Sequence, residues 1–151
     1  KSVALAAIEE VRPGMLIGLG TGRAAEAFVD LLAERQAAGL KVEAISTSVR
    51  TSARCAELGI PLVSFTDRRI DVAFDGADEV APDGSLIKGL GGAMLRERVV
   101  ANYSRRFIVL VTEEKRVTTL GERCPLPVEV VSFAAVAVTA LIAHLTDEDA
   151  E

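Results

Sequence analysis

The stretch MLIGLGTGRA, residues 15–24, decides the fold. A short apolar run, Met15 to Leu19, passes through closely spaced glycines, and apolar residues then recur at helical spacing at Ala24, Ala27, Phe28, Leu31 and Leu32. An apolar run of this length bounded by glycine predicts a buried strand, and the spacing that follows predicts a helix. The stretch therefore indicates the first strand and helix of an α/β sheet.

Similar apolar runs recur along the chain, at Val42 to Ile45, Pro61 to Phe65, Ile70 to Phe74 and Phe107 to Val111. Helices are expected before Pro13-Gly14, at Ser52 to Leu58 with Gly59 as its end, and at Ala93 to Tyr103. The alternation predicts an open, mostly parallel sheet flanked by helices.

The 151 residues, half of them apolar, are enough for one buried core. A compositional break at Cys124-Pro-Leu-Pro127 divides residues 1–123, expected to form the catalytic α/β domain, from residues 124–151. The second part should begin a small α/β unit, with one strand and one alanine-rich helix before an acidic tail at Asp147 to Glu151.

The charge and hydropathy of the chain exclude several classes of partner. With 17 basic and 22 acidic residues and 4% aromatics, the chain does not resemble a nucleic-acid-binding protein. The longest apolar stretch, Phe133 to Leu145, is shorter than the roughly 20 residues of a membrane span. Because Glu9 and Glu10 interrupt the first apolar run, no signal-peptide core is expected, and the predicted location is the cytoplasm.

The few histidine and cysteine residues limit the chemistry. His144, Cys55 and Cys124 cannot build a zinc cage or a histidine-based nucleophile triad. The thiols lack CxxC spacing, which favours a reducing compartment. Carboxylate chemistry without a metal remains open.

Ligands of open parallel sheets bind beyond the carboxyl ends of the strands, so a ligand site is expected in the loops there. The glycine turn, residues 18–22, would present backbone N–H groups to an anion at the start of a helix, which suggests a phosphate site. The alternative is a tight strand-to-helix turn without a ligand. The spacing is not the GxGxxG of a dinucleotide site.

The aspartate loop, residues 75–79, places Asp75, Asp78 and Glu79 close together at the end of a strand. Like charges at this spacing raise at least one pKa and can keep a proton donor beside an acceptor. A calcium loop is disfavoured because Pro82 and Lys88 interrupt the ligand pattern. A plain polar turn is the other alternative.

The lysine–glycine loop, residues 88–92, leads into the helix that carries Glu97. Lys88 and the exposed amides after it form a combination that stabilises an oxyanion, and Glu97 is a candidate base. Arg96 and Arg98 lie roughly 100° to either side of Glu97 on a helix, so they need not neutralise it.

Taken in order, these motifs resemble those of ribose-5-phosphate isomerases of the A type. The motifs are Gly18 to Gly22, Ser46-Thr-Ser48, Asp75 to Glu79, Leu86 to Gly92, Arg96-Glu97-Arg98, Lys115 and Pro125 to Glu129. The resemblance implies a Rossmann-like sheet of the isomerase/CoA-transferase type. It also implies a homodimer that interconverts ribose 5-phosphate and ribulose 5-phosphate, in the non-oxidative pentose phosphate pathway, without a metal or organic cofactor.

The resemblance assigns roles to individual residues. Glu97 would move a proton between two sugar carbons, Lys88 with the Gly91 and Gly92 amides would stabilise the enediolate, and Asp75 or Asp78 would assist ring opening. The expected substrate-binding residues are Thr21, Gly22, Arg23, Ala24, Asp75, Gly76, Ala77, Asp78, Lys88, Gly89, Leu90, Gly91 and Lys115.

The chain departs from the family pattern at several points. Arg23 and Ala24 stand where serine and threonine hydroxyls usually help to hold the phosphate, and Arg23 could replace them by a bidentate grip. Leu90 stands where glycine is usual, and residues 112–114 also differ.

Family members are longer and carry a small α/β domain after Pro125 to Glu129. The last helix should therefore expose an apolar face, including Val136, Leu141 and Leu145, that a partner subunit or further residues would cover.

Two other functions remain open. One is a non-catalytic sugar-phosphate sensor on the same fold, and the other is a related protein with a different substrate. Glu97, Lys88 and the aspartate pair favour the enzyme, because a sensor needs no base directed at a C–H bond.

Overall fold

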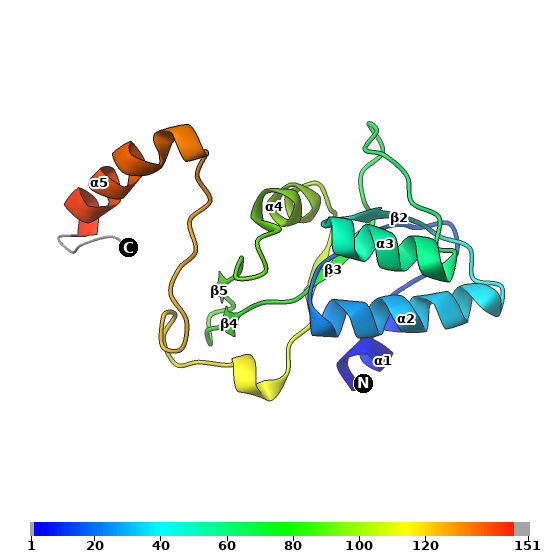
Figure 1. Ribbon diagram of the computed structural model, residues 1–151. Helices are drawn as coiled ribbons and strands as arrows, with labels where there is room; N and C mark the ends of the chain where they lie inside the picture. The colour runs from blue at the N-terminus through cyan, green and yellow to red at the C-terminus, as the bar shows by residue number, and fades with distance from the viewer. Residues whose placement is uncertain (1, 147–151) are drawn as a thin grey trace.

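The computed structural model describes residues 2–146, and the predicted acidic tail lies outside them. Eleven helices and strands follow one another along these residues (Figure 1). They are α1 (Ser2–Ile8), β1 (Leu16–Leu19), α2 (Arg23–Ala37), β2 (Glu43–Ser46), α3 (Val49–Leu58), β3 (Val72–Asp75), β4 (Glu79–Val80), β5 (Leu86–Ile87), α4 (Met94–Asn102), β6 (Phe107–Val109) and α5 (Ala135–Thr146). Short 3₁₀ turns form at Glu113–Lys115 and Ser132–Ala134.

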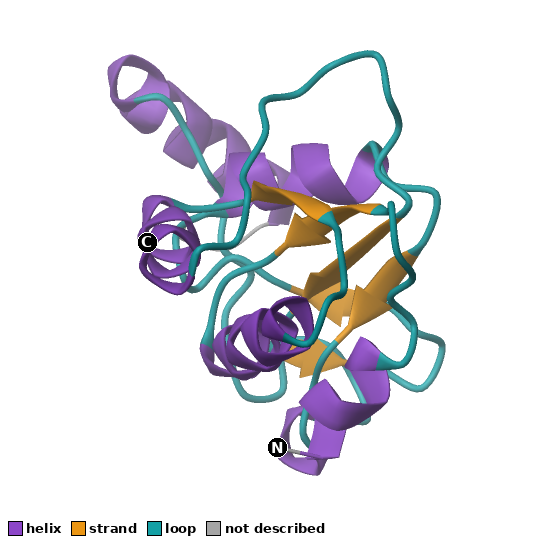
Figure 2. Ribbon diagram, turned by 90° about the vertical axis from the view of Figure 1, so that its right-hand side faces the viewer, coloured by secondary structure: helices purple, strands orange, loops and turns teal. Residues whose placement is uncertain are grey.

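The central sheet is parallel, with the strand order β2-β1-β3-β6 (Figure 2). Ile17 of β1 pairs with Ala44 on one side and with Val72 on the other. All residues of β1 and β3 are buried, as expected of strands covered on both faces. The predicted open, mostly parallel α/β sheet is confirmed.

Alternate residues of β1 face two separate layers of the core. Ile17 and Leu19 pack with Phe28 of α2 and with α1, and Phe28 stacks on Phe74 with ring centroids 4.2 Å apart. Leu16 packs with Val100 of α4 on the opposite face. Because a Cβ at Gly18 would lie 2.6 Å from Val100 Cγ1, glycine at this position lets α4 approach the sheet closely.

The prediction of a strand at Pro61 to Phe65 is wrong. The segment makes a single parallel bridge, between Ala44 and Leu62, and otherwise runs as a loop. Pro61 has no N–H to donate to a ladder, and the side chains of Leu62 and Phe65 are exposed rather than buried.

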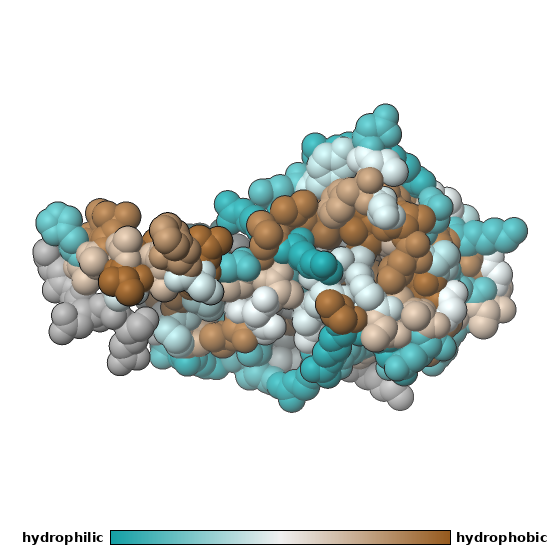
Figure 3. All heavy atoms as spheres, turned by 45° about the horizontal axis from the view of Figure 1, so that its top comes forward, coloured by the Kyte–Doolittle hydropathy of each residue, from teal (hydrophilic) through white to brown (hydrophobic). Residues whose placement is uncertain are grey.

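The end of the described chain also differs from expectation. No strand forms at residues 124–131, where no neighbouring strand is present in the described part of the chain to pair with it. The predicted helix does form as α5, but it lies away from the sheet (Figure 1), and Val136, Leu141 and Leu145 are exposed. Apolar side chains gather on this outlying helix in Figure 3. None of the described helices is both long and apolar enough to span a bilayer.

Candidate active site

A cavity of about 500 Å³ lies beyond the carboxyl ends of β1, β3 and β6. The glycine turn, the aspartate loop, the lysine–glycine loop and the segment after β6 all contribute to its wall. Parallel pairing brings the glycine turn, the aspartate loop and the segment after β6 together, because each follows a strand that ends at the same edge of the sheet, whereas the lysine–glycine loop follows β5. A small antiparallel hairpin of β4 and β5, which was not predicted from the sequence, connects the aspartate loop to the lysine–glycine loop.

Asp75 lies at the end of β3, beneath the cavity floor, and is 2% exposed. Its Oδ1 accepts hydrogen bonds from the backbone N–H of Thr21 (3.0 Å) and of Gly76 (2.8 Å). A Cβ at Gly20 would lie 2.0 Å from that oxygen, so the glycine turn must carry glycine here. Asp75 thus connects the glycine turn to the aspartate loop.

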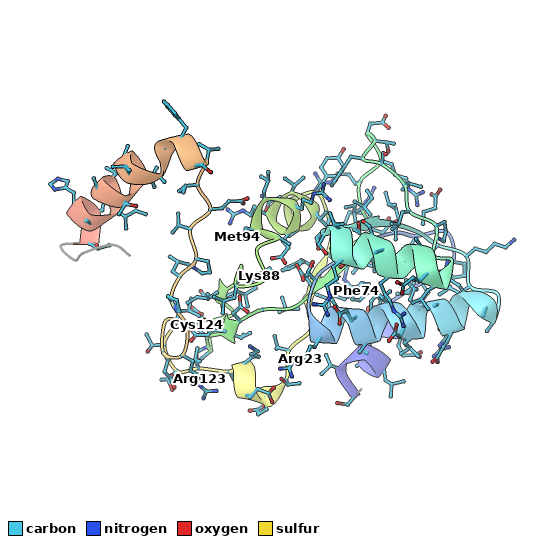
Figure 4. All side chains as sticks on the ribbon, viewed as in Figure 1. Arg23, Phe74, Lys88, Met94, Arg123 and Cys124 are labelled. Atoms are coloured by element: carbon cyan, nitrogen blue, oxygen red, sulfur yellow. The ribbon has the colours of Figure 1, made fainter. Side chains whose placement is uncertain are left out.

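The Lys88 ammonium lies between two buried carboxylates. Nζ is 3.0 Å from Asp75 Oδ2 and 3.3 Å from Glu97 Oε2, and it also donates to the Gly76 carbonyl oxygen at 2.5 Å. The aspartate loop, the lysine–glycine loop and α4 therefore place two anions within hydrogen-bond or ion-pair distance of one cation. Figure 4 shows Lys88 pointing from the hairpin toward the end of the sheet near Phe74.

Glu97 lies in the first turn of α4 and is 6% exposed, although it faces the cavity. Burial raises the pKa of its carboxyl group, and the charges of Asp75 and Asp78 raise it further, while Lys88 opposes them. The net result is a pKa above the ordinary range of glutamate. Arg96 and Arg98 are exposed, so the adjacent arginines point away from it.

Asp78, the second carboxylate of the aspartate loop, faces the cavity. Its Oδ2 accepts a hydrogen bond from the Leu90 N–H at 3.1 Å, while the Leu90 side chain is 55% exposed and lies outside the cavity lining. The expectation for the Gly92 amide is wrong, because this N–H is donated to the Gly89 carbonyl oxygen at 2.9 Å. Gly91 does line the cavity.

Glu79, the third acid of the loop, points away from this group. It is fully buried, and its carboxylate accepts backbone N–H groups from Gly121, Arg123 and Cys124. Burial opposes its ionisation, but the three donors outweigh burial and hold its pKa below the ordinary value. The predicted cluster of three mutually repelling carboxylates is therefore wrong: of the three acids, Asp78 lines the cavity, Asp75 lies beneath its lining, and Glu79 points away.

Further positive groups line the cavity at the start of α2 and after β6. Gly22, with φ 104°, precedes α2 and makes no side-chain cap, so the first amides of α2 are left for another acceptor. Arg23, at the start of α2 (Figure 4), and Lys115, in the turn after β6, both line the cavity. The Thr21 hydroxyl is bonded to the Thr47 hydroxyl at 2.9 Å.

Most of the sequence-predicted site residues line this cavity. They are Thr21, Gly22, Arg23, Ala24, Gly76, Ala77, Asp78, Lys88, Gly89, Gly91, Glu97 and Lys115. Asp75 lies beneath the lining and Leu90 outside it. The residues that sequence reasoning missed are Val3, Ala4, Ala27, Leu110, Val111, Thr112 and Glu114. Residues 110–112 directly follow β6, so their position after a parallel strand could have indicated that they line the site. Nothing in the sequence indicated that α1, which carries Val3 and Ala4, reaches the site.

Comparisons with known proteins find one family over most of the chain. The family model of ribose 5-phosphate isomerase A (phosphoriboisomerase A) matches residues 43–150. The chain is 49% identical to the ribose-5-phosphate isomerase A of Gluconobacter oxydans, over 88% of this chain and 58% of that protein. It is 50% identical to the protein of the same name from Agrobacterium fabrum, over 93% of this chain and 61% of that one.

Solved structures give the same result. The ribose 5-phosphate isomerase A of Methanocaldococcus jannaschii superimposes with a TM-score of 0.92 at 40% identity, over 95% of this chain and 65% of that one. A D-ribose-5-phosphate isomerase solved in complex with phospho-erythronic acid gives a TM-score of 0.91 at 36% identity, over 95% of this chain and 64% of that one. The chain thus spans less than two thirds of the length of these relatives.

Proposed function

Because the chain belongs to the ribose 5-phosphate isomerase A family, we propose that it interconverts ribose 5-phosphate and ribulose 5-phosphate in the cavity at the strand ends. The observation that carries the proposal is the Lys88 ammonium held 3.3 Å from the buried Glu97 carboxylate on the cavity wall. A base beside a fixed cation is what the removal of a proton next to a carbonyl group requires. A mere sensor of phosphosugars would not need this pair.

In the proposed reaction, Glu97 removes the proton from C2 of the open-chain aldose. The electrons of the C–H bond form the C1–C2 double bond of an enediolate, and the negative charge passes to the C1 oxygen. Glu97 then returns the proton to C1, and the proton of the C2 hydroxyl passes to the negative C1 oxygen, so that C1 carries the hydroxyl group and C2 the carbonyl group of the ketose. The raised pKa of Glu97 suits both steps, because the carboxyl group must accept a proton and then release it.

Lys88 supplies the positive charge beside the developing oxyanion, with the Gly91 amide as a second donor on the same wall. Asp75 holds Lys88 at 3.0 Å and is already engaged by two backbone N–H groups. It therefore positions the lysine. Asp78, which lines the cavity, is the acid placed to exchange protons with sugar hydroxyls and to assist ring opening.

We assign the phosphate group to the other end, at the start of α2. The free amides of α2 and the positive charges of Arg23 and Lys115 lie together on the wall there. A guanidinium group can take two phosphate oxygens at once, so Arg23 compensates for the hydroxyls that the family usually has.

Replacing Arg23 with alanine tests this assignment. We expect the KM for ribose 5-phosphate to rise about tenfold, the effect of losing one charge-assisted hydrogen bond, with little change in kcat. The double change Arg23→Ser and Ala24→Thr should leave KM near its original value. Arg50→Ala, which removes an exposed arginine that pairs with Glu26, is the control. An unchanged KM in R23A would show that Arg23 does not hold the phosphate.

The pH dependence of kcat/KM provides another test. Protonated Glu97 cannot accept a proton, so activity should fall as the pH drops through its pKa. Because burial and the two aspartates raise that pKa, the acid limb should lie above the ordinary glutamate range. Glu113→Gln, on an exposed acid paired with Arg116, should leave the limb in place. A limb at or below the ordinary range would contradict the assignment.

The proposal extends to the setting of the enzyme. We expect a cytoplasmic homodimer in the non-oxidative pentose phosphate pathway, with a domain boundary near residue 124. The family resemblance supports these expectations, and the uncovered apolar side chains of α5 support the dimer.

Incubation of the purified chain with ribose 5-phosphate tests the activity itself, with ketose formation as the readout. No ketose above the uncatalysed rate would refute the proposed function.

A further inference from the structure

We propose that Glu79, an acid that takes no part in the proton transfer, is a positioning residue that sets the distance between the two walls of the cavity. The inference rests on the proposed function, because it concerns how that site holds its substrate. One wall is the β4–β5 hairpin with its loops, which carry Asp78 and Lys88. The other is the turn after β6, which carries Lys115.

Glu79 binds a distant part of the chain through its carboxylate. Oε2 accepts the Gly121 N–H at 2.6 Å, and Oε1 accepts the N–H groups of Arg123 (2.5 Å) and Cys124 (2.9 Å). The side chain is 0% exposed. This contact, here called the Glu79 clamp, holds residues 121–124 against the hairpin, and Figure 4 shows Cys124 beside the hairpin.

On the hairpin side, Glu79 is adjacent to the catalytic groups in both sequence and space. It directly follows Asp78, and it pairs with Ile87, the residue before Lys88. The Asp78 N–H also donates to the Ile87 carbonyl oxygen at 2.8 Å, so the backbone of the hairpin keeps Asp78 and Lys88 in place independently of what the Glu79 carboxylate binds. The Glu79 carboxylate itself lies outside the cavity lining, so it cannot contact the sugar there.

On the other side, the clamped segment holds the turn that carries Lys115. The Arg123 guanidinium group donates to the carbonyl oxygen of Glu114, the residue before Lys115. The Val117 N–H also donates to the Val80 carbonyl oxygen at 3.0 Å, next to the clamp. The hairpin, the clamped segment and the lysine turn are thus joined in one continuous set of contacts.

The clamp requires a carboxylate rather than any polar group. Three N–H donors converge on two oxygens, and an ionised carboxylate can only accept. A glutamine could keep the Arg123 and Cys124 bonds through its oxygen, but its NH₂ group would then face the Gly121 N–H. That N–H would be left without an acceptor in a buried place, which is costly enough to displace the segment.

The experiment compares Glu79→Gln with Asp83→Asn at the tip of the same hairpin. Asp83 also accepts hydrogen bonds, but they come from Ser85 within the hairpin, and Asp83 lies outside the cavity lining. We expect E79Q to raise the KM for ribose 5-phosphate about tenfold, with kcat within about twofold of the original, because Lys115 is displaced while Glu97 and Lys88 are kept. D83N should change neither constant. A kcat loss without a change in KM, or equal effects of the two variants, would overturn the proposal.

A second variant and a second readout separate this inference from the proposed function. Arg123→Gln leaves Glu79 intact and removes the link to Glu114 together with an exposed ion pair to the adjacent Glu122. Because the side chain is exposed, the variant should fold and raise KM in the same direction by a smaller factor. The affinity for inorganic phosphate, measured by calorimetry, should fall in both variants relative to D83N. If the chain lacks isomerase activity, the proposed function fails while this affinity still decides the role of the clamp. An unchanged phosphate affinity in both E79Q and R123Q would reject the positioning role of Glu79.

Discussion

Changing Glu97 to glutamine is expected to lower kcat for ribose 5-phosphate by roughly 10²–10⁴-fold. Glutamine has nearly the shape of glutamate and can still accept a hydrogen bond from Lys88, so the walls of the cavity should be retained. It cannot take a proton from carbon, because its amide is neutral and very weakly basic. KM should therefore change little, and the rate of ketose formation is the measurement.

Glu34→Gln on α2 is the matched control, because it also replaces a carboxylate with an amide, but at an exposed position. It should retain full activity. If E97Q turned over ribose 5-phosphate at a rate within about threefold of the original chain, another group would have to be the base, since general-base catalysis accounts for far more than that factor.

Changing Lys88 to methionine should give the second largest effect, a loss in kcat of roughly 10²–10³-fold, the scale for removing one oxyanion donor from an enzyme site. Methionine has a comparable length but no charge. Its presence would leave the buried Asp75 and Glu97 carboxylates without their shared cation. Because Lys88 lowers the pKa of Glu97, the residual activity should show an acid limb at higher pH than in the original chain.

The same variant should be less stable, since removing one partner of a buried ion pair costs about 3–5 kcal/mol. Part of that cost is recovered if Glu97 takes up a proton. Lys41→Met, at an exposed position, controls for the loss of a lysine. An acid limb that stayed in place in K88M would show that Lys88 does not act on the base of the reaction.

Much of the fold follows from local patterns in the sequence. The strands β1, β3 and β6 are short apolar runs with glycine or polar boundaries, and α3 ends where Gly59 takes a left-handed φ of 71°. Two predicted strands failed because strands depend on partners as well as on composition. Pro61 cannot complete a ladder, and residues 124–131 have no adjacent strand among the described residues to pair with.

The site was predictable to the extent that it follows from the ends of parallel strands. The place of Asp75 at the end of β3 is a consequence of topology, which the alternation of strands and helices already indicated. Lys88 is brought to Asp75 and Glu97 by the β4–β5 hairpin, which was not predicted. The direction of each side chain was not predictable either. Asp78 directly precedes β4 and lines the cavity, whereas its neighbour Glu79 begins β4 and binds the other segment through the Glu79 clamp. The part played by Gly121, Arg123 and Cys124 depends on a contact between distant segments that no local pattern reveals.

A structure of the chain soaked with phospho-erythronic acid, the compound present in one of the similar structures, tests the central claim most directly. This molecule has a phosphate group at one end and a carboxylate at the other, which carries its charge where the enediolate would. We predict its carboxylate beside Lys88 and Glu97 and its phosphate beside Arg23, Lys115 and the start of α2. A molecule bound in the opposite direction, or bound outside the cavity, would contradict the account.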